Sequence, residues 1–306
     1  MIPQSQNLRL GLVQWKKATL VGVGLLGGSL GLALKQRGLA RSVVGYVRRS
    51  ASISECTKAH AVDEATCELN EAVHGADLIV LCTPISTMQP LVRRMLPALK
   101  RGAIVTDVGS VKGSVVRDLD HCVAQAGAHF IGSHPMAGSE RTGVQAAHAD
   151  LFANAICVVT PTRRSSKTAT RKITALWRAV GARPMLLDPV KHDKLVSRSS
   201  HLTHLVAAQL AAYVLHPQHP PEQALLCANG FRDTTRIAAS SPEMWRDITL
   251  ANRTHIERAL QRFIRELTKL HHVIRAGDAR RIEAFFAGAQ QRRQQWQLPS
   301  AAASPE

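Results

Sequence analysis

A glycine-rich turn between two apolar segments constrains the fold of this chain more than any other feature. Residues 18–21 form a short uncharged run, and the pattern Gly22-x-Gly24-x-x-Gly27 follows it directly. The residues after the turn have helical spacing up to Arg37. In a strand–turn–helix unit the first glycine permits the tight turn, the second lets the backbone approach a pyrophosphate, and the third lets the helix pack against the strand. The pattern therefore predicts a Rossmann-type βαβ unit whose helix N-terminus faces phosphate groups.

Strand-like and helix-like segments alternate over about the next 150 residues, as judged from the spacing of apolar residues. Further strands are expected at residues 42–47, 78–82, 103–106, 129–134, 154–160 and 183–187. Helices are expected at residues 50–60, with Ser50 as N-cap, and at 86–96, 111–126 and 168–180. This alternation predicts an α/β fold with a doubly wound, mostly parallel sheet that carries helices on both faces.

The pattern changes after residue 187, where every apolar periodicity becomes helical. Breaks are expected at residues 216–221 and 240–242. We therefore predict a dinucleotide-binding domain at 1–187 with a loose leader of about fourteen residues, a helical domain at 188–295, and a disordered tail at 296–306, with fraying from residue 290. The apolar stripes of the helical domain exceed what its own helices can cover, so we expect it to form a homodimer.

The composition narrows the class of protein. The chain has 306 residues, of which 45% are hydrophobic and 20% charged, as in a globular protein. A formal charge of +17 invites nucleic-acid binding, but the arginines are spread along the chain, and only two tyrosines and six phenylalanines could stack on bases. A solvated basic surface that attracts anionic metabolites is the favoured interpretation, with no nucleic-acid partner.

Two further features bear on location. Residues 18–34 carry no charge, but the run is shorter than the ~20 residues of a membrane span and is interrupted by glycines. Six cysteines without a C-x-x-C pair indicate reduced core thiols in place of a disulfide framework. We therefore expect a cytoplasmic protein with no membrane partner.

The end of the second predicted strand indicates which dinucleotide binds. An Asp or Glu there would accept a hydrogen bond from a ribose 2′-hydroxyl, but the chain has Val47-Arg48-Arg49-Ser50. Arginine suits a 2′-phosphate, so NADP is favoured over NAD, the alternative being that both arginines are solvated loop residues. The expected cofactor-binding residues are Gly22, Gly24, Leu25, Leu26, Gly27, Arg48, Arg49, Ser50, Cys82, Thr83, Pro84 and Asp107.

His134 is the strongest candidate for chemistry. It ends a predicted strand, in the sequence Gly132-Ser133-His134-Pro135, and an imidazole can accept a proton near neutral pH. Ser110 follows the preceding predicted strand, and ligands of open α/β sheets collect at that end of the strands. A single histidine of this kind is more often structural, so the role of His134 depends on the residues around it.

With these motifs the chain closely resembles the prephenate/arogenate dehydrogenase family of tyrosine biosynthesis. Six blocks carry the resemblance, in order and with similar spacing over about residues 19–290. They are residues 21–30, 106–113, 132–140, 200–204, 231–238 and 244–247.

The resemblance implies an NAD(P)-dependent oxidative decarboxylation of prephenate and/or arogenate. A ring carbinol gives up a hydride while the ring loses carbon dioxide and becomes aromatic. His134 would accept the hydroxyl proton, Ser110 would fix the geometry, and Arg236 would clamp the ring carboxylate of the anionic substrate. His204 matches a position near the substrate side chain. Trp245 and Ser133 are further substrate-binding candidates, and Glu140 and Thr142 could close the His134 loop.

Several departures and alternatives stay open. Thr203 stands where the family often has proline, and Asn229-Gly230 replaces a common Gly-Gly pair. His201-x-x-His204 could be half of a zinc site, but no third ligand has suitable spacing, so no metal is expected. No ACT domain or fused chorismate mutase is expected. A slight preference for prephenate follows because the matched blocks offer no acidic partner for the ammonium group of arogenate.

Rival functions are a β-hydroxyacid dehydrogenase or imine reductase, and an NADP-binding sensor without catalysis. The His134 block and the absence of a catalytic-lysine motif around Lys191 and Lys194 argue against the first. Retention of Ser110, His134 and Arg236 argues against the second.

Overall fold

The computed structural model describes residues 15–138 and 141–296. The chain divides into two compact units, one up to residue 253 and one from residue 254. The predicted leader at residues 1–14, the loop candidate Glu140 and residues 297–306 of the predicted tail lie outside the described residues.

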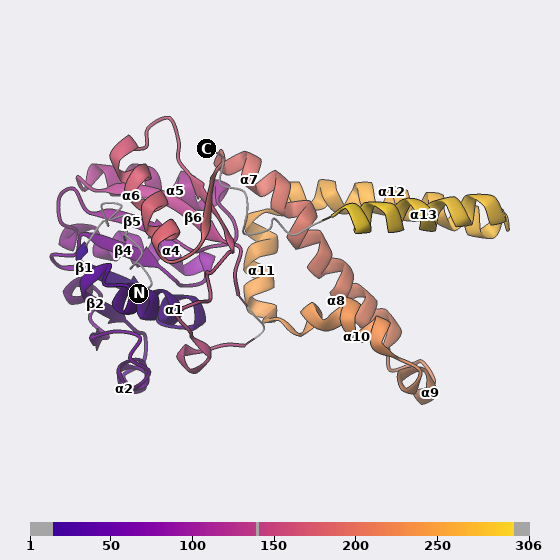
Figure 1. The fold of residues 1–306 in the computed structure, drawn as a ribbon, viewed down its shortest axis with the longest axis horizontal. Coiled ribbons are helices and arrows are strands. Elements are labelled where there is room, and N and C mark those ends of the chain that lie inside the picture. The colour runs from indigo at the N-terminus through magenta and orange to yellow at the C-terminus, as the bar shows by residue number, and fades with distance from the viewer. Residues whose placement is uncertain (1–14, 139–140, 297–306) are drawn as a thin grey trace, which may run out of the picture. The chain divides into compact units, whose positions relative to one another are not determined.

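An eight-stranded sheet forms the frame of the first unit (Figure 1). Its order is β3-β2-β1-β4-β5-β6-β7-β8, and every neighbouring pair is parallel except β6 and β7. The strands are β1 (Trp15–Val21), β2 (Ala40–Tyr46), β3 (Glu64–Thr66), β4 (Leu78–Leu81), β5 (Ile104–Asp107), β6 (His129–Pro135), β7 (Ile156–Thr160) and β8 (Arg183–Leu186). The chain reverses its winding between β1 and β4, so the carboxyl ends of these two strands form the switch point where such sheets bind ligands.

Helices cover both faces of the sheet. They are α1 (Leu25–Gln36), α2 (Ala51–Lys58), α3 (Leu69–Val73), α4 (Ile85–Met95), α5 (Gly113–Gln125) and α6 (Lys167–Ala179), with short 3-10 turns at Leu96–Ala98 and Val144–Ala146. One core packs α1 and α6 against the sheet, and the other packs α3, α4 and α5. Within β4, Leu78 and Val80 enter the first core while Ile79 and Leu81 enter the second. Burial on both faces explains the continuous apolar runs of the sequence.

The rest of the first unit is helical, as predicted. It comprises α7 (Pro189–Val196), a π-helical segment Ser197–His201, α8 (Leu202–Val214), α9 (Pro221–Leu225), α10 (Asn229–Thr235), a 3-10 turn Arg236–Ala239 and α11 (Pro242–Ala251). The predicted breaks at residues 216–221 and 240–242 are confirmed. Asp188 caps α7, because its carboxylate accepts hydrogen bonds from the N–H groups of Val190 and Lys191.

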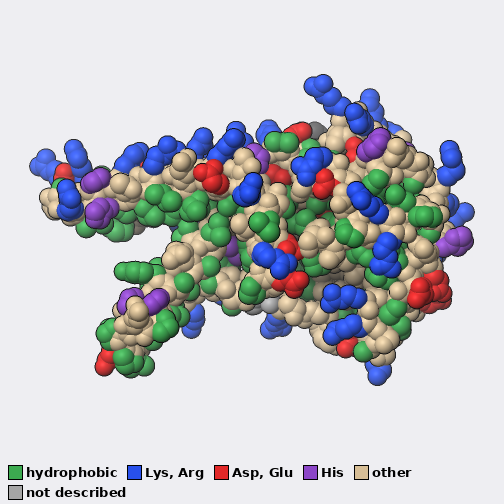
Figure 2. Space-filling view, turned by 180° about the vertical axis from the view of Figure 1, so that it is seen from behind, with side chains coloured by type: hydrophobic (Ala, Val, Ile, Leu, Met, Phe, Trp, Pro, Cys, Tyr) green, Lys and Arg blue, Asp and Glu red, His purple; other side chains and the backbone are tan. Residues whose placement is uncertain are grey.

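The second unit contains α12 (Arg253–Arg275) and α13 (Ala279–Gln295), which are joined by a turn at Gly277. Leu260, Ile264 and Leu267 are exposed and follow one another at helical spacing. Figure 2 shows hydrophobic side chains along one side of this helix pair and a row of Lys and Arg side chains along the other. The predicted fraying from residue 290 is wrong up to Gln295, because α13 continues that far.

Two smaller expectations need correction. Ser50 stands at the N-cap position of α2, as predicted, but its hydroxyl accepts no capping hydrogen bond and its backbone is already helical. The six cysteines are all free thiols, as expected, but only Cys56 and Cys157 are fully buried. No helix in the described ranges has both the length and the apolar character needed to cross a membrane.

Candidate active site

The glycine turn lies at the switch point of the sheet. Gly22 has a φ of +96°, and a Cβ atom there would lie 2.8 Å from the carbonyl oxygen of Cys82. A Cβ atom at Gly27 would overlap the carbonyl oxygen of Gly22. At Gly24 the same atom would meet nothing within 4 Å. Two of the glycines are therefore needed by the fold, whereas Gly24 leaves open space beside the first turn of α1, where Leu25 and Leu26 begin the helix.

The opposite side of this turn is formed by the residues after β4. Cys82 and Thr83 are half-buried and Pro84 is exposed. The hydroxyl of Thr83 is buried and has no hydrogen-bond partner in the structure. A buried polar atom without a partner is costly, so an orphan hydroxyl beside an open glycine turn fits a ligand with polar atoms. The free N–H groups at the α1 N-terminus suit its phosphates, and these residues therefore fit a dinucleotide.

The segment predicted to select the cofactor lies at the same edge of the sheet. The N–H of Gly22 donates to the carbonyl oxygen of Tyr46 at 2.9 Å, which ties the glycine turn to the end of β2. Arg48, Arg49 and Ser50 follow as exposed residues before α2. Val47 stands where an acidic residue would select NAD, and two exposed guanidinium groups follow it.

A buried ion pair joins the end of β5 to the start of α5 and contacts β6. Lys112 and Asp107 are both completely buried, and they form a direct ion pair. The Lys112 ammonium also donates to the carbonyl oxygen of Ser133 at 2.9 Å. Asp107 further accepts from the N–H groups of Gly109 and Ser133. Because removing one partner of such a pair leaves a buried charge, this network holds the loop after β5 firmly against β6.

This network changes the interpretation of two predicted site residues. Ser133 has no exposed surface, and its hydroxyl donates to the Asp107 carbonyl oxygen at 2.6 Å and lies 2.9 Å from the Thr106 hydroxyl. The Asp107 carboxylate is occupied by Lys112 and two N–H groups. We therefore assign Ser133 and Asp107 a supporting role in place of the predicted direct contacts to substrate and cofactor. Their side-chain polar atoms are buried and hydrogen-bonded within the protein, so a ligand cannot reach them.

His134 heads a chain of buried polar groups. It is 7% exposed, and its Nδ1 lies 2.9 Å from Nε2 of His192, which is fully buried. The Nδ1 of His192 in turn lies 2.8 Å from a carboxylate oxygen of Asp193. The Asp193 carboxylate also accepts from the N–H groups of Lys112 and Gly113, each at 2.8 Å. The strand end, the start of α5 and the helix α7 thus converge on one imidazole.

The surroundings favour a neutral His134. Burial lowers the pKa of His134 well below its usual 6.5, and the nearby His192, Lys112 and His201 lower it further. A neutral imidazole keeps one nitrogen with a free lone pair, which is the form that can accept a proton.

Ser110 lies half-buried in the loop between β5 and α5. The buried Asp107–Lys112 pair fixes both ends of this loop. Ser110 is thereby held at the same edge of the sheet as His134.

A second cluster surrounds Trp245 of α11. The ring of His204 stacks on the Trp245 indole with 3.9 Å between centroids, and His201 meets it edge-on at 5.9 Å. Burial lowers the pKa of His204, and the charge of Arg236 lowers it further, so Arg236 lies within electrostatic reach of this cluster. The structure thus brings together three of the predicted substrate residues, His204, Trp245 and Arg236.

The two clusters are linked through Asn252. Its side-chain amide donates to the Asp193 carbonyl oxygen at 3.0 Å and lies 3.1 Å from Nδ1 of His201. His201 is held by Asn252 and the aromatic ring, and within residues 15–138 and 141–296 no group of three or more His, Cys, Asp or Glu side chains is arranged to hold a metal. Thr142, predicted to help close the His134 loop, is exposed.

Sequence reasoning missed Lys112, His192, Asp193 and Asn252. Lys112 lies inside the 106–113 block, where a lysine directly before a helix gives no sign that it is buried. The adjacent pair His192-Asp193 in a helix was the one available signal, since a carboxylate next to a histidine often orients the ring.

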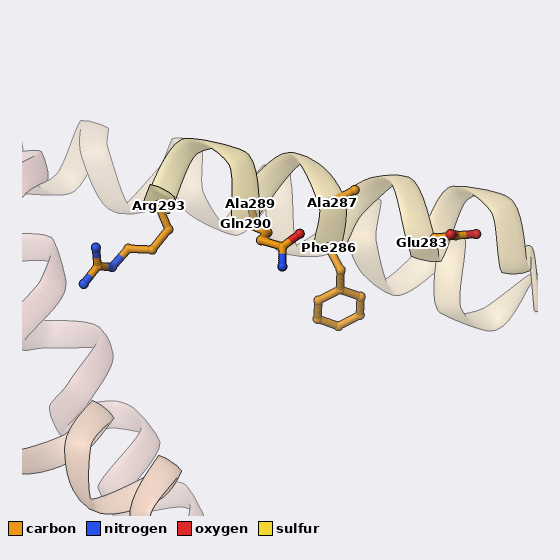
Figure 3. Close-up of a pocket in the computed structure, with 6 residues that line it drawn as sticks. All are labelled: Glu283, Phe286, Ala287, Ala289, Gln290 and Arg293. Atoms are coloured by element: carbon orange, nitrogen blue, oxygen red, sulfur yellow. The ribbon is translucent and has the colours of Figure 1, made fainter. Parts of the chain in front are cut away.

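An open hollow of about 740 Å³ also lies along α13 (Figure 3). It is lined by Glu283, Phe286, Ala287, Ala289, Gln290 and Arg293. All of these residues come from one helix, and Figure 3 shows their side chains directed to different sides. The hollow has no converging donors, so chemistry is assigned to the His134 cluster.

Two family models match the chain. The model described as prephenate dehydrogenase, nucleotide-binding domain, matches residues 30–186, and the model described as prephenate dehydrogenase, dimerization domain, matches residues 188–288.

Individual relatives agree with the family models. The prephenate dehydrogenase of Bacillus subtilis is 34% identical over 88% of this chain and 73% of that protein. The cyclohexadienyl dehydrogenase of Zymomonas mobilis is 33% identical over 91% of this chain and 95% of that protein. The crystal structure of prephenate dehydrogenase from A. aeolicus in complex with hydroxyphenyl propionate and NAD+ has a TM-score of 0.84 and 31% identity, covering 91% of this chain and 98% of that one.

Proposed function

The chain belongs to the prephenate dehydrogenase family, and we propose that His134 is the proton acceptor of its reaction. The protein is an oxidoreductase that carries out the NAD(P)-dependent oxidative decarboxylation of prephenate and/or arogenate in tyrosine biosynthesis. This activity replaces the alternatives of a β-hydroxyacid dehydrogenase, an imine reductase or a sensor. The observation that carries the role of His134 is its buried, neutral imidazole, held through Nδ1 at the carboxyl edge of the sheet.

The reaction asks little of the protein beyond orientation and charge placement, because aromatisation of the ring drives it. When bound, NAD(P) supplies the acceptor for the hydride. His134 accepts the proton of the ring hydroxyl as the C–H bond of the carbinol breaks. The bond from the ring to its carboxylate then breaks and carbon dioxide leaves. The electron pair of that bond completes the aromatic ring, and the ring oxygen takes the proton back from His134. Ser110 orients the hydroxyl or the imidazole from the loop after β5.

Cationic and aromatic side chains bind the dianionic substrate. Arg236 offers two parallel N–H donors to the ring carboxylate. His204 and Trp245 face the substrate side chain, and their stacked rings support this assignment because each fixes the orientation of the other. Prephenate is the favoured substrate. Among the described residues of the matched blocks, the carboxylates Asp107, Asp233 and Asp247 each already have a cationic partner, Lys112, Arg232 and Arg246.

The cofactor is NADP in preference to NAD. Gly24 and the α1 N-terminus would hold its pyrophosphate, together with Leu25, Leu26 and the segment 82–84. Arg48, Arg49 and Ser50 bind the 2′-phosphate. The support for this preference is the pair of exposed guanidinium groups after β2, where no acidic residue follows the strand.

The helical region forms a homodimer. The match to a dimerization domain supports this, together with the exposed apolar residues of α12 and α13. We place the domain boundary between residues 187 and 188, because the sheet ends at Leu186 and Asp188 caps the first helix that follows.

Four assays with the purified protein test substrate and cofactor together. Formation of NADPH or NADH is followed at 340 nm with prephenate and with arogenate. The proposal predicts the highest kcat/KM with prephenate and NADP. A higher kcat/KM with arogenate, or with NAD, would overturn the corresponding assignment, and no reduced cofactor with either substrate would overturn the function.

A further inference from the structure

We propose that His192 and Asp193 form a positioning pair that fixes the tautomer of His134, so that Nε2 is the nitrogen that accepts the substrate proton. This inference rests on the proposed role of His134. Neither residue touches the reacting atoms in the scheme above, so both act through the imidazole of His134.

Asp193 is fixed as an acceptor on both oxygens. Its Oδ1 accepts from the N–H of Lys112 at 2.8 Å, and its Oδ2 accepts from the N–H of Gly113 at the same distance. These N–H groups belong to the start of α5, where backbone donors are free and the helix dipole favours a negative charge. The Asn252 amide holds the Asp193 carbonyl oxygen at 3.0 Å. Both oxygens of Asp193 are therefore held as acceptors, and the side chain has little freedom to move.

The Asp193 carboxylate determines which ring nitrogen of His192 carries the hydrogen. Because Oδ1 of Asp193 can only accept, the Nδ1 of His192, 2.8 Å away, carries a hydrogen. In the proposed arrangement this is the single N–H hydrogen of His192, so its Nε2 has a lone pair. The Nδ1 of His134 lies 2.9 Å from that lone pair, so it must be the donor. With its hydrogen on Nδ1, a neutral His134 keeps its lone pair on Nε2.

The same chain supports the charge that forms during turnover. Accepting a proton turns His134 into a cation in a buried site that also contains Lys112 and faces His201. The charge of Lys112 is balanced by Asp107, its ion-pair partner. Asp193 is the carboxylate linked to His134, and its charge reaches the imidazole through His192. The pair thus holds the ring in place before the reaction and stabilises it afterwards.

Two polar substitutions of His192 separate this role from packing. The amide nitrogen of His192→Asn can take the place of Nδ1 and keep the contact with Asp193, but the side chain is too short to reach His134. The amide oxygen of His192→Gln can take the place of Nε2 and accept from His134, while the contact with Asp193 is lost. Kinetics with prephenate and NADP, melting temperature and NADPH affinity are measured for both variants and the wild type.

We expect kcat of His192→Asn to fall by about 10- to 100-fold, the range seen when a partner that orients a functional histidine is removed. KM for prephenate and the NADPH affinity stay within about threefold of wild type. His192→Gln recovers part of kcat, because it restores the hydrogen bond to His134 but not the link to Asp193. A folded His192→Asn with wild-type kcat, or a His192→Gln as slow as His192→Asn, would overturn the proposal. Absence of any wild-type turnover would instead overturn the proposed function itself.

Discussion

At residue 134 an ordinary imidazole is surrounded by groups that favour its neutral form. Lys112, His192 and His201 all lower the pKa of His134 in addition to its burial. Burial also lowers the pKa of His201, to about 4, although Asp193 partly opposes this. A base that stays neutral in mildly acidic solution remains able to accept a proton there.

This environment sets the acidic limb of the pH profile. A lowered pKa means that His134 is neutral above that pKa and is lost as a base only when the pH falls through it. Because kcat/KM reports the free enzyme, we expect kcat/KM for prephenate to be level from pH 8 to about 6.5, the ordinary histidine value, and to fall only at lower pH. Initial rates across a buffer series measure this. A decline that begins above pH 7 would contradict the burial argument.

Arg236 is the residue on which substrate affinity should depend most. Arg236→Gln removes a charge-assisted clamp on the ring carboxylate, so KM for prephenate should rise by about 10- to 100-fold, equivalent to the 1.5–3 kcal/mol of a charged hydrogen bond. We expect kcat to change much less. Arg232→Gln is the matched control, because Arg232 is exposed in α10, one turn before Arg236. Equal KM effects in both variants would mean that the net positive charge of the region, and not a specific clamp, binds the substrate.

At the scale of single elements, the turn before α1 separates folding from cofactor binding. Gly24→Ala places a methyl group in open space, so its melting temperature should stay close to wild type while KM for NADP rises. Gly27→Ala drives the methyl group into the Gly22 carbonyl oxygen and should lower the melting temperature by several degrees, about 1 kcal/mol or more. Thermal unfolding and steady-state kinetics test both. A Gly24→Ala variant with unchanged KM would show that the pyrophosphate does not approach residue 24.

The sequence predicted helices and strands well where the apolar pattern extended over many residues. The strands of the alternating region and the helices α1, α4, α5 and α6 lie within a few residues of the predicted ranges. β3 and α3 were missed because they span only three and five residues, too few to show a period. The antiparallel pairing of β7 with β6 was also invisible, since it depends on a connection that contains only a short 3-10 turn and no crossover helix.

The site was predictable only in part, for a related reason. The spacing of the glycines and a histidine at a strand end can be recognised from the sequence alone. The burial of Lys112 and the contact between His134 and His192 arise from packing between segments that lie 58 residues apart in the second case. Ser133 illustrates the opposite error, because a polar residue next to a functional histidine was assigned to the substrate although its hydroxyl is consumed by the backbone of Asp107.

At the scale of the whole molecule, the second unit has the character of an interface. Leu260, Ile264 and Leu267 form an exposed apolar stripe on α12, while Arg258 and Arg262 lie on its opposite side by helical spacing. Exposed apolar surface of this extent is unusual for a monomer and typical of association. The basic stripe remains in solvent and accounts for part of the formal charge of +17.

The dimer interface can be tested with one substitution in the apolar stripe of α12 and one in its basic stripe. Ile264→Lys places a charge in the proposed interface, so the protein should behave as a monomer in size-exclusion chromatography with light scattering. Arg262→Gln, on the opposite stripe of the same helix, should leave the molar mass at twice that of the chain. A monomeric wild type, or dissociation by both substitutions alike, would contradict this placement of the interface.

The most direct test of the whole account is the turnover of His134→Asn with prephenate and NADP. Asparagine keeps a polar side chain of similar size but cannot take up the proton, so we expect kcat to fall by about two orders of magnitude or more, as for the loss of a general base. The affinity for NADPH should stay near that of the wild type, because the dinucleotide binds at the glycine turn. A folded His134→Asn that binds NADPH normally and turns over prephenate within a few-fold of the wild-type rate would contradict the account.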